Sequence, residues 1–222
     1  IRVATGGAHW SGSVGFFGDD VNNNGVTTAD DEGSGWHWRL TYAPIATPKA
    51  LLHVGTSGYY RNVATGQNTE LSSVGQLRLR STPEYSIENT RLVDTGNLAF
   101  ADEVSLYALE AATMYGPVGL QAEWVQMDVS ESAGRPDLDF NGAYVSANWF
   151  LTGESRVYDP RTGLFTRFKP RANVDPAAGY WGAWEFAARW STLDLNSKEN
   201  LRRGTTLLGV RGGEETNYTL GV

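Results

Sequence analysis

The chain has 222 residues, including 26 glycines, 8 tryptophans and 10 tyrosines, yet its mean hydropathy is only -0.35. Its formal net charge of -7 and the lack of a Lys/Arg-rich run disfavour a nucleic-acid partner. With no cysteine it has neither disulfides nor Cys-ligated metals. No stretch approaches the roughly 20 apolar residues of a spanning helix, so a chain of this kind that enters a membrane does so as strands.

Apolar and polar residues alternate with a period of two, the primary sequence signal of β-strands. In the clearest case, Trp184, Phe186 and Trp190 share one face while Glu185 and Arg189 share the other. One face suits lipid and the other suits water. The alternating segments, in chain order, are 10–16, 36–42, 52–61, 76–80, 120–124, 143–151 and 184–191.

Two segments fit this pattern less well. The stretch from Glu103 to Tyr115 is rich in helix formers, follows Asp102 as a possible cap and ends at Gly116-Pro117. Taken alone it suits a helix as well as a strand, and its neighbours favour a strand. The stretch from Thr82 to Asp102 requires either an additional strand or an inward-folded loop, and the sequence leaves both open.

The connections between these segments are of two kinds. Short ones contain Pro or Gly, as at Ala43 to Lys49 and at Gly116-Pro117, whereas Asp19 to Gly35 and Asn62 to Ser73 are long and polar. Tight turns at one end and long loops at the other are typical of outer-membrane barrels. The sequence therefore predicts an all-β fold, an antiparallel transmembrane β-barrel.

Several phrases carry a family resemblance. The stretch from Phe150 to Tyr158, then Gly163-Leu-Phe165 and Lys169-Pro170, then Gly182 to Arg189, resemble the phosphate-selective porins O and P. Further matches in the same order are Gly15 to Asp20, Leu52 to Gly55, Arg91 to Gly96, Leu193 to Leu195 and Glu215 to Val222.

The resemblance implies a 16-stranded barrel in a Gram-negative outer membrane, usually a homotrimer, that passes small anions such as chloride, phosphate or polyphosphate. Sixteen strands of ~10 residues with their loops need more than this chain supplies. We therefore expect residues 1–222 to be one porin β-barrel region that lacks N-terminal strands and the last C-terminal strands, and that does not close a pore alone. The family's constriction loop is expected upstream, so its phosphate-site residues are not carried over.

A porin performs no bond chemistry, and anion preference requires Arg or Lys along a wet pore. Guanidinium gives bidentate contacts to phosphate oxygens and stays charged. The competing interpretation is that each arginine pairs with an acid, as Arg189 would with Glu185, and the net charge of -7 also argues against anion preference. The pore-lining candidates are Arg39, Arg61, Arg78, Arg80, Arg156, Arg167, Lys169, Arg171 and Arg189.

Alternative functions remain open at this stage. The same scaffold could serve a general or sugar porin, and a soluble or surface-attached β-sandwich could use the aromatic residues to bind carbohydrate, or bind calcium. Asp20 to Gly25, with Asp31 at the twelfth position, resembles the start of a calcium loop, although an exposed turn uses the same residue types. His9, His37 and His53 lack metal-ligand spacing. With no nucleophile elbow either, we predict a protein that is not an enzyme and has no metal or cofactor.

Overall fold

The computed structural model describes residues 1–18, 34–63, 77–84 and 90–222. Nine strands form one sheet in the order β1-β2-β3-β4-β7-β8-β9-β14-β17, and every neighbouring pair is antiparallel. The strands are β1 (Arg2–Gly6), β2 (Trp10–Gly18), β3 (Ser34–Ala46), β4 (Ala50–Asn62), β7 (Ala101–Tyr115), β8 (Val118–Glu131), β9 (Leu138–Phe150), β14 (Glu185–Ser197) and β17 (Val210–Gly221).

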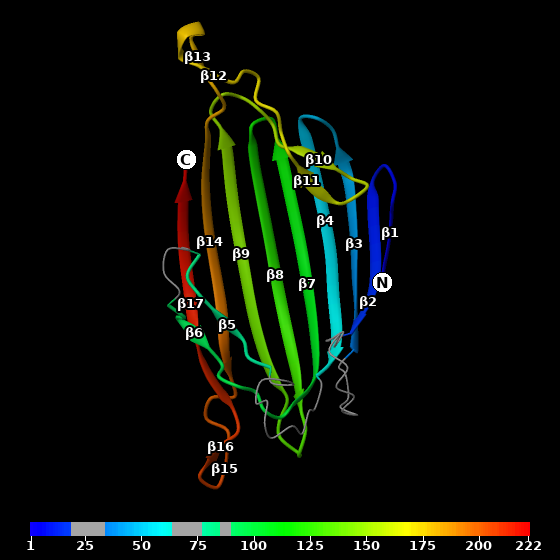
Figure 1. The fold of residues 1–222 in the computed structure, drawn as a ribbon, viewed down its shortest axis with the longest axis vertical. Coiled ribbons are helices and arrows are strands. Elements are labelled where there is room, and N and C mark those ends of the chain that lie inside the picture. Colours follow the sequence, from blue (N-terminus) through cyan, green and yellow to red (C-terminus); the bar gives the residue numbers. More distant parts are fainter. Residues whose placement is uncertain (19–33, 64–76, 85–89) are drawn as a thin grey trace, which may run out of the picture.

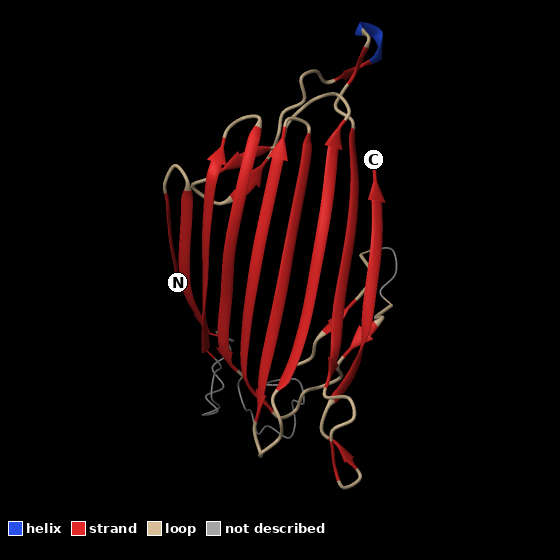
Figure 2. Ribbon diagram, turned by 180° about the vertical axis from the view of Figure 1, so that it is seen from behind, coloured by secondary structure: helices blue, strands red, loops and turns tan. Residues whose placement is uncertain are grey.

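The all-β, antiparallel prediction is confirmed. The long strands lie side by side along the long axis of the molecule, and the two chain ends lie at opposite edges of the sheet (Figures 1 and 2). Among the described residues β1 and β17 each pair with a single strand, so the sheet is open there. The described strands form one large sheet with small two-stranded ribbons rather than the two packed sheets of a sandwich. The described part contains no helix of the length and apolarity that crossing a membrane requires.

Strand alternation gives the sheet two different faces. The apolar face exposes large side chains such as Trp36, Leu109 and Trp149. The opposite face, here called the covered face, carries Arg39 and Glu110, and other parts of the chain fold over it. Because successive strand side chains point to opposite sides, the alternation seen in the sequence places each set on its own face.

The segment rich in helix formers is a strand. Along its whole length, β4 pairs residue by residue with residues 103–115 of β7, and the pairing has no bulge. On its other side β7 pairs with β8. Backbone pairing on both sides and burial of Val104, Ala108 and Ala112 outweigh the weak intrinsic helix preference of these residues.

The stretch around Thr82 to Asp102 folds inward, which decides between the two alternatives for its described residues. β5 (Arg80–Ser81) pairs with β6 (Val93–Asp94), and Leu77 bridges to Leu98. We call residues 77–84 and 90–100 the inner segment. Its apolar side chains join a buried cluster on the covered face that includes Val104, Val129, Leu138, Phe140 and Leu195.

One expectation for this region is wrong. The alternation of Leu77 and Leu79 with arginines predicted a spanning strand, but both leucines pack against the buried cluster of the covered face. The alternation is real, but it serves packing within the molecule: Leu77 and Leu79 contact the cluster, and Arg78 pairs with Asp94 of the same segment. The position of the family's constriction loop upstream stays a prediction.

The connection from β9 to β14 lies at the same end of the sheet as the short turns at 47–49 and 116–117. Its ribbon β10 (Val157–Asp159) and β11 (Leu164–Thr166) folds over the covered face near β3 and β4, while β12 (Val174–Asp175), the 3-10 helix η1 (Pro176–Ala178) and β13 (Tyr180–Trp181) extend past the sheet (Figure 1). At the opposite end lies the ribbon of β15 (Arg202–Arg203) and β16 (Thr206–Leu207). The predicted calcium-like loop, Asp20 to Asp31, lies outside the described residues, as does most of the two long polar connections.

The stability of the inner segment should depend on the buried side chain of Leu98. Leu98 is 5% exposed in the cluster, whereas Leu92 in the same segment is 58% exposed. We expect Leu98→Ala to lower the free energy of opening of this segment by about 2–5 kcal/mol, the usual cost of truncating a buried leucine. Leu92→Ala, the matched control, should change it by less than about 0.5 kcal/mol. Native-state proteolysis measures both, and equal effects would contradict this packing.

Candidate functional site

A charged network crosses three neighbouring strands of the covered face. Arg39 on β3 donates to Glu110 on β7, with Nη2–Oε1 at 2.5 Å and Nε–Oε2 at 3.3 Å. His53 on β4 contacts the same oxygen, Glu110 Oε1, through Nε2 at 3.0 Å. Gly55 makes room for this arrangement, since a Cβ there would lie 2.4 Å from the Glu110 carboxylate. The register of three strands thus brings one acid and two bases together.

This network also fastens the β10–β11 ribbon to the sheet. Arg39 donates to the carbonyl oxygens of Gly163 at 2.9 Å and Thr162 at 3.3 Å. The hydroxyl of Tyr158 lies 2.6 Å from Nδ1 of His53. Arg39 therefore donates its hydrogen bonds to one carboxylate and to backbone carbonyls of the ribbon.

Arg156, on the same connection, is held differently. Its Nη1 donates to Oε1 of Gln121 on β8 at 2.9 Å, and its guanidinium lies 4.4 Å from the centre of the Phe165 ring. Both partners are neutral. No described acid forms an ion pair with Arg156, so its positive charge is not compensated by a direct contact in the described part of the chain.

A second network joins the inner segment to β14 and β17. Glu84 lies 2.7 Å from Arg189 Nε and accepts hydrogen bonds from Ser191 and Thr219, both at 2.8 Å. The Arg189 guanidinium also covers the Tyr144 ring at 3.8 Å. Desolvation by burial raises the pKa of Glu84, but the two hydroxyl hydrogen bonds and Arg189 outweigh it, so the pKa is lowered and the carboxylate stays ionised.

Within the inner segment, Arg78 and Asp94 form a bidentate pair. Arg78 Nε donates to Asp94 Oδ1 at 2.8 Å, and Nη2 donates to Oδ2. The backbone N–H of Gly96 adds a bond to Oδ1 at 2.9 Å. The hydrogen bond from Arg78, followed by that of Gly96, lowers the pKa of Asp94 to about 2.

The nine predicted pore-lining residues fall into three groups. Arg39, Arg78 and Arg189 pair with acids, and the acid paired with Arg189 is Glu84, so the predicted pairing with Glu185 is wrong. Arg156 and Arg171 are held by neutral groups, Arg171 donating to the carbonyls of Thr152 and Gly153. The remaining four are Arg61, half-buried on β4, and the exposed Arg80, Arg167 and Lys169.

The sequence missed several residues of these networks. Strand parity places Glu110 and Tyr144 on the same face as the arginines, but the helix-like composition of 103–115 concealed the alternation around Glu110. Glu84 is 107 residues away from its partner Ser191. No local pattern connects two such distant positions.

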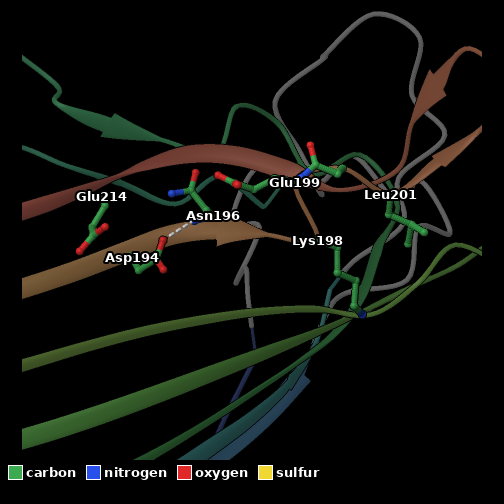
Figure 3. Close-up of a pocket in the computed structure, with 7 residues that line it drawn as sticks. Asp194, Asn196, Lys198, Glu199, Leu201 and Glu214 are labelled. Atoms are coloured by element: carbon green, nitrogen blue, oxygen red, sulfur yellow. Dashed lines mark hydrogen bonds between the residues drawn. The ribbon is translucent and has the colours of Figure 1, made fainter.

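A hollow lies where β14 ends and β17 begins, at the end of the sheet that carries the β15–β16 ribbon. It has a volume of about 810 Å³ and is lined by Asp194, Asn196, Lys198, Glu199, Asn200, Leu201 and Glu214 (Figure 3). Asp194 accepts from the backbone N–H of Asn196 at 2.9 Å, and Lys198 donates to the carbonyl of Asp137. The predominance of acids makes it unsuited to phosphate. Nowhere in the described ranges do three or more His, Asp or Glu side chains come together in a way that could hold a metal ion.

A sheet with large apolar side chains on one face and charged pairs on the other, with chain segments folded over the charged face, has the architecture of a porin wall. The chain belongs to the family of phosphate-selective porins O and P, which it matches over residues 1–222. It is 31% identical over 214 residues to an uncharacterized protein of Caulobacter vibrioides, covering 93% of this chain and 38% of that protein. It is 26% identical over 199 residues to Porin O of Pseudomonas aeruginosa, covering 84% of this chain and 43% of Porin O. The chain thus spans less than half the length of these relatives.

The low pKa of Asp94 predicts a pH-dependent link. Because the folded pKa of about 2 lies below the ordinary 3.8, the ionised pair stabilises the inner segment above about pH 4 and is lost as the pH falls through 2. Carboxyl-carbon NMR of Asp94 should show a midpoint near 2, moving towards 3.8 in Arg78→Gln. Arg80→Gln is the control and should shift the midpoint less, since Arg80 acts on Asp94 only through its charge. A midpoint near 3.8 in the unaltered protein would rule out the pair.

Arg39 should control the attachment of the β10–β11 ribbon. Arg39→Met removes its bonds to Glu110 and to two ribbon carbonyls, and we expect trypsin to cut after Arg161 roughly tenfold faster, as the loss of one charge-assisted hydrogen bond implies. Arg2→Met is the control because Arg2 donates to Ser13 at the sheet edge. Equal cleavage rates in all three proteins would show that the ribbon is held by other contacts.

Proposed function

We propose that this chain forms part of the wall of a β-barrel channel in the outer membrane of a Gram-negative bacterium, and that the channel passes small anions by passive diffusion. The apolar face would contact lipid and the covered face would line the lumen. A free strand edge in lipid leaves backbone groups unsatisfied. We therefore propose that β1 and β17 pair with further strands of the same barrel, in a homotrimer such as the family resemblance implies.

The anion proposal rests on one observation, that the contacts of the Arg156 guanidinium are with neutral groups. A guanidinium held by an amide and an aromatic ring keeps its charge for a solute, whereas one paired with a carboxylate is largely neutralised. It lies on a segment folded over the covered face, as a pore-narrowing residue would. Phosphate or polyphosphate is the proposed solute because phosphate oxygens match the guanidinium fork and because of the family to which the chain belongs.

A general porin is the second candidate, and the paired arginines favour it. Arg39, Arg78 and Arg189 each contact an acid, which reduces the fixed positive charge that a passing ion would meet. The two candidates differ in how phosphate acts. A phosphate channel binds phosphate in the lumen, so added phosphate should block the chloride current, whereas a general porin should be indifferent.

The decisive measurement is the reversal potential of the full-length parent protein in a planar bilayer under a KCl gradient. A unit charge about 8 Å from the ion path is worth roughly 0.5 kcal/mol in water. Its removal disfavours chloride and favours potassium by that amount each, so Arg156→Gln should lower the chloride-to-potassium permeability ratio about fivefold. Arg202→Gln removes the same charge from the distant β15–β16 ribbon and should leave the ratio unchanged.

Three results would count against the proposal. A cation-preferring channel would exclude anion passage, and equal ratios in both variants would remove Arg156 from the ion path. A chloride current that phosphate does not block would retain the channel and favour the general porin.

A further inference from the structure

A cavity of about 310 Å³ lies on the covered face, between the inner segment and the sheet. Its lining is mostly apolar, and two of the three polar residues in it are the arginines Arg78 and Arg80 of the inner segment. Well-packed interiors contain few voids larger than a water molecule, whereas pockets that bind small molecules measure roughly 300–1,000 Å³. The size of this cavity therefore suits a small ligand better than a packing defect.

The apolar floor of the cavity follows from the strand register. Leu106 on β7 pairs with Met127 on β8, and Met127 pairs with Phe140 on β9. These three residues therefore form one row across neighbouring strands. Val125 lies two residues from Met127, so its side chain points to the same face, and all four line the cavity. The floor is thus one continuous apolar surface.

The inner segment brings a positive charge to the edge of this cavity. Leu79 lines the cavity, and its neighbours Arg78 and Arg80 line it too and are exposed to solvent. Both oxygens of Asp94 accept hydrogen bonds from Arg78, whereas Arg80 acts on this acid only through its charge. Arg80 forms no ion pair with any residue of the described ranges. Its guanidinium is therefore available to an anion.

We propose that this cavity binds short alkanoates, with the carboxylate on the Arg80 guanidinium and the aliphatic tail on the apolar floor. A carboxylate matches the planar donor fork of arginine, and each methylene that leaves water adds favourable free energy. A single negative charge suits the site, because the carboxylate of Asp94 lies beside Arg80 and would repel a dianion. The proposed ligand differs from phosphate, which has no apolar part to cover the floor.

Calorimetry of the full-length parent in lipid nanodiscs tests the site with hexanoate and butanoate at constant ionic strength, with the heat of empty nanodiscs subtracted. We expect hexanoate to occupy one saturable site. It should bind about fifteenfold more tightly than butanoate, since each of two further buried methylenes contributes about fourfold. Hexylammonium has the same tail and the opposite charge, so it should not saturate the site.

Three variants locate the ligand. Arg80→Gln should weaken hexanoate binding roughly fivefold, as the loss of a partly hydrated ion pair implies. Arg91→Gln is the matched control, because it removes the same charge from an exposed position of the inner segment that does not line the cavity. Its affinity should be unchanged. Val125→Phe places a ring in the cavity and should abolish saturable binding.

Four results would overturn the inference. Equal affinities for hexanoate and butanoate would leave only a surface anion site, and equal binding of hexylammonium would show apolar partition without Arg80. An equal loss in Arg80→Gln and Arg91→Gln would show general charge screening. Absence of saturable binding would show that the cavity does not take alkanoates. If Val125→Phe fails to fold, the two arginine variants and the tail comparison decide. The inference stands independently of anion passage, because binding heats are measured without ion flow.

Discussion

Strand register is the constraint on which the other features of this molecule depend. Along β4 and β7 the pairing runs without a bulge, and it places His53 opposite Ala112 and Gly55 opposite Glu110. A shift of one residue would turn every side chain of a strand to the other face. Glu110 would then enter the apolar face and Leu109 the covered face, which would separate Glu110 from Arg39. Both charged networks exist because the pairing is regular where they lie, at Arg39 to Thr41 of β3 with β4, along β4 with β7, and at Arg189 to Ser191 of β14 with β9 and β17.

The segments that fold over the covered face bring the acids and carbonyls that its arginines need. The inner segment contributes Glu84 to Arg189, and the β10–β11 ribbon contributes carbonyls to Arg39. Each contact fixes a segment in place, and the contact of Glu84 with Arg189 also neutralises a positive charge on the covered face. Counting arginines by strand parity therefore overestimates the free charge of the wall. What matters for an ion is whether the partner of each guanidinium is charged, and this separates Arg156 from Arg39.

The sequence predicted the faces better than it predicted the contacts. Alternation is a local property, so it placed Arg39 and Arg189 on one face and Trp36 and Trp190 on the other. It could not tell a lipid-facing surface from internal packing, and so it mistook Leu77 and Leu79 for part of a spanning strand. Helix propensity around Glu110 is also local, and pairing with β4 and β8 overrides it. The link between Glu84 and Ser191 joins positions 107 residues apart, which no periodicity can reveal.

Partial exposure limits how much the ion pairs of the two networks contribute by charge alone. The side chains of Arg39 and Glu110 are 27% and 21% exposed, so water screens much of their attraction, and partly exposed ion pairs contribute little by themselves. The hold of Arg39 on the ribbon therefore comes mainly from hydrogen bonds to carbonyls in a fixed geometry. The side chains of Arg189 and Glu84 are 39% and 27% exposed, so water screens the ion pair of the second network in the same way. In both networks the fixed hydrogen bonds of the paired groups, more than their charges alone, therefore hold the segments over the covered face.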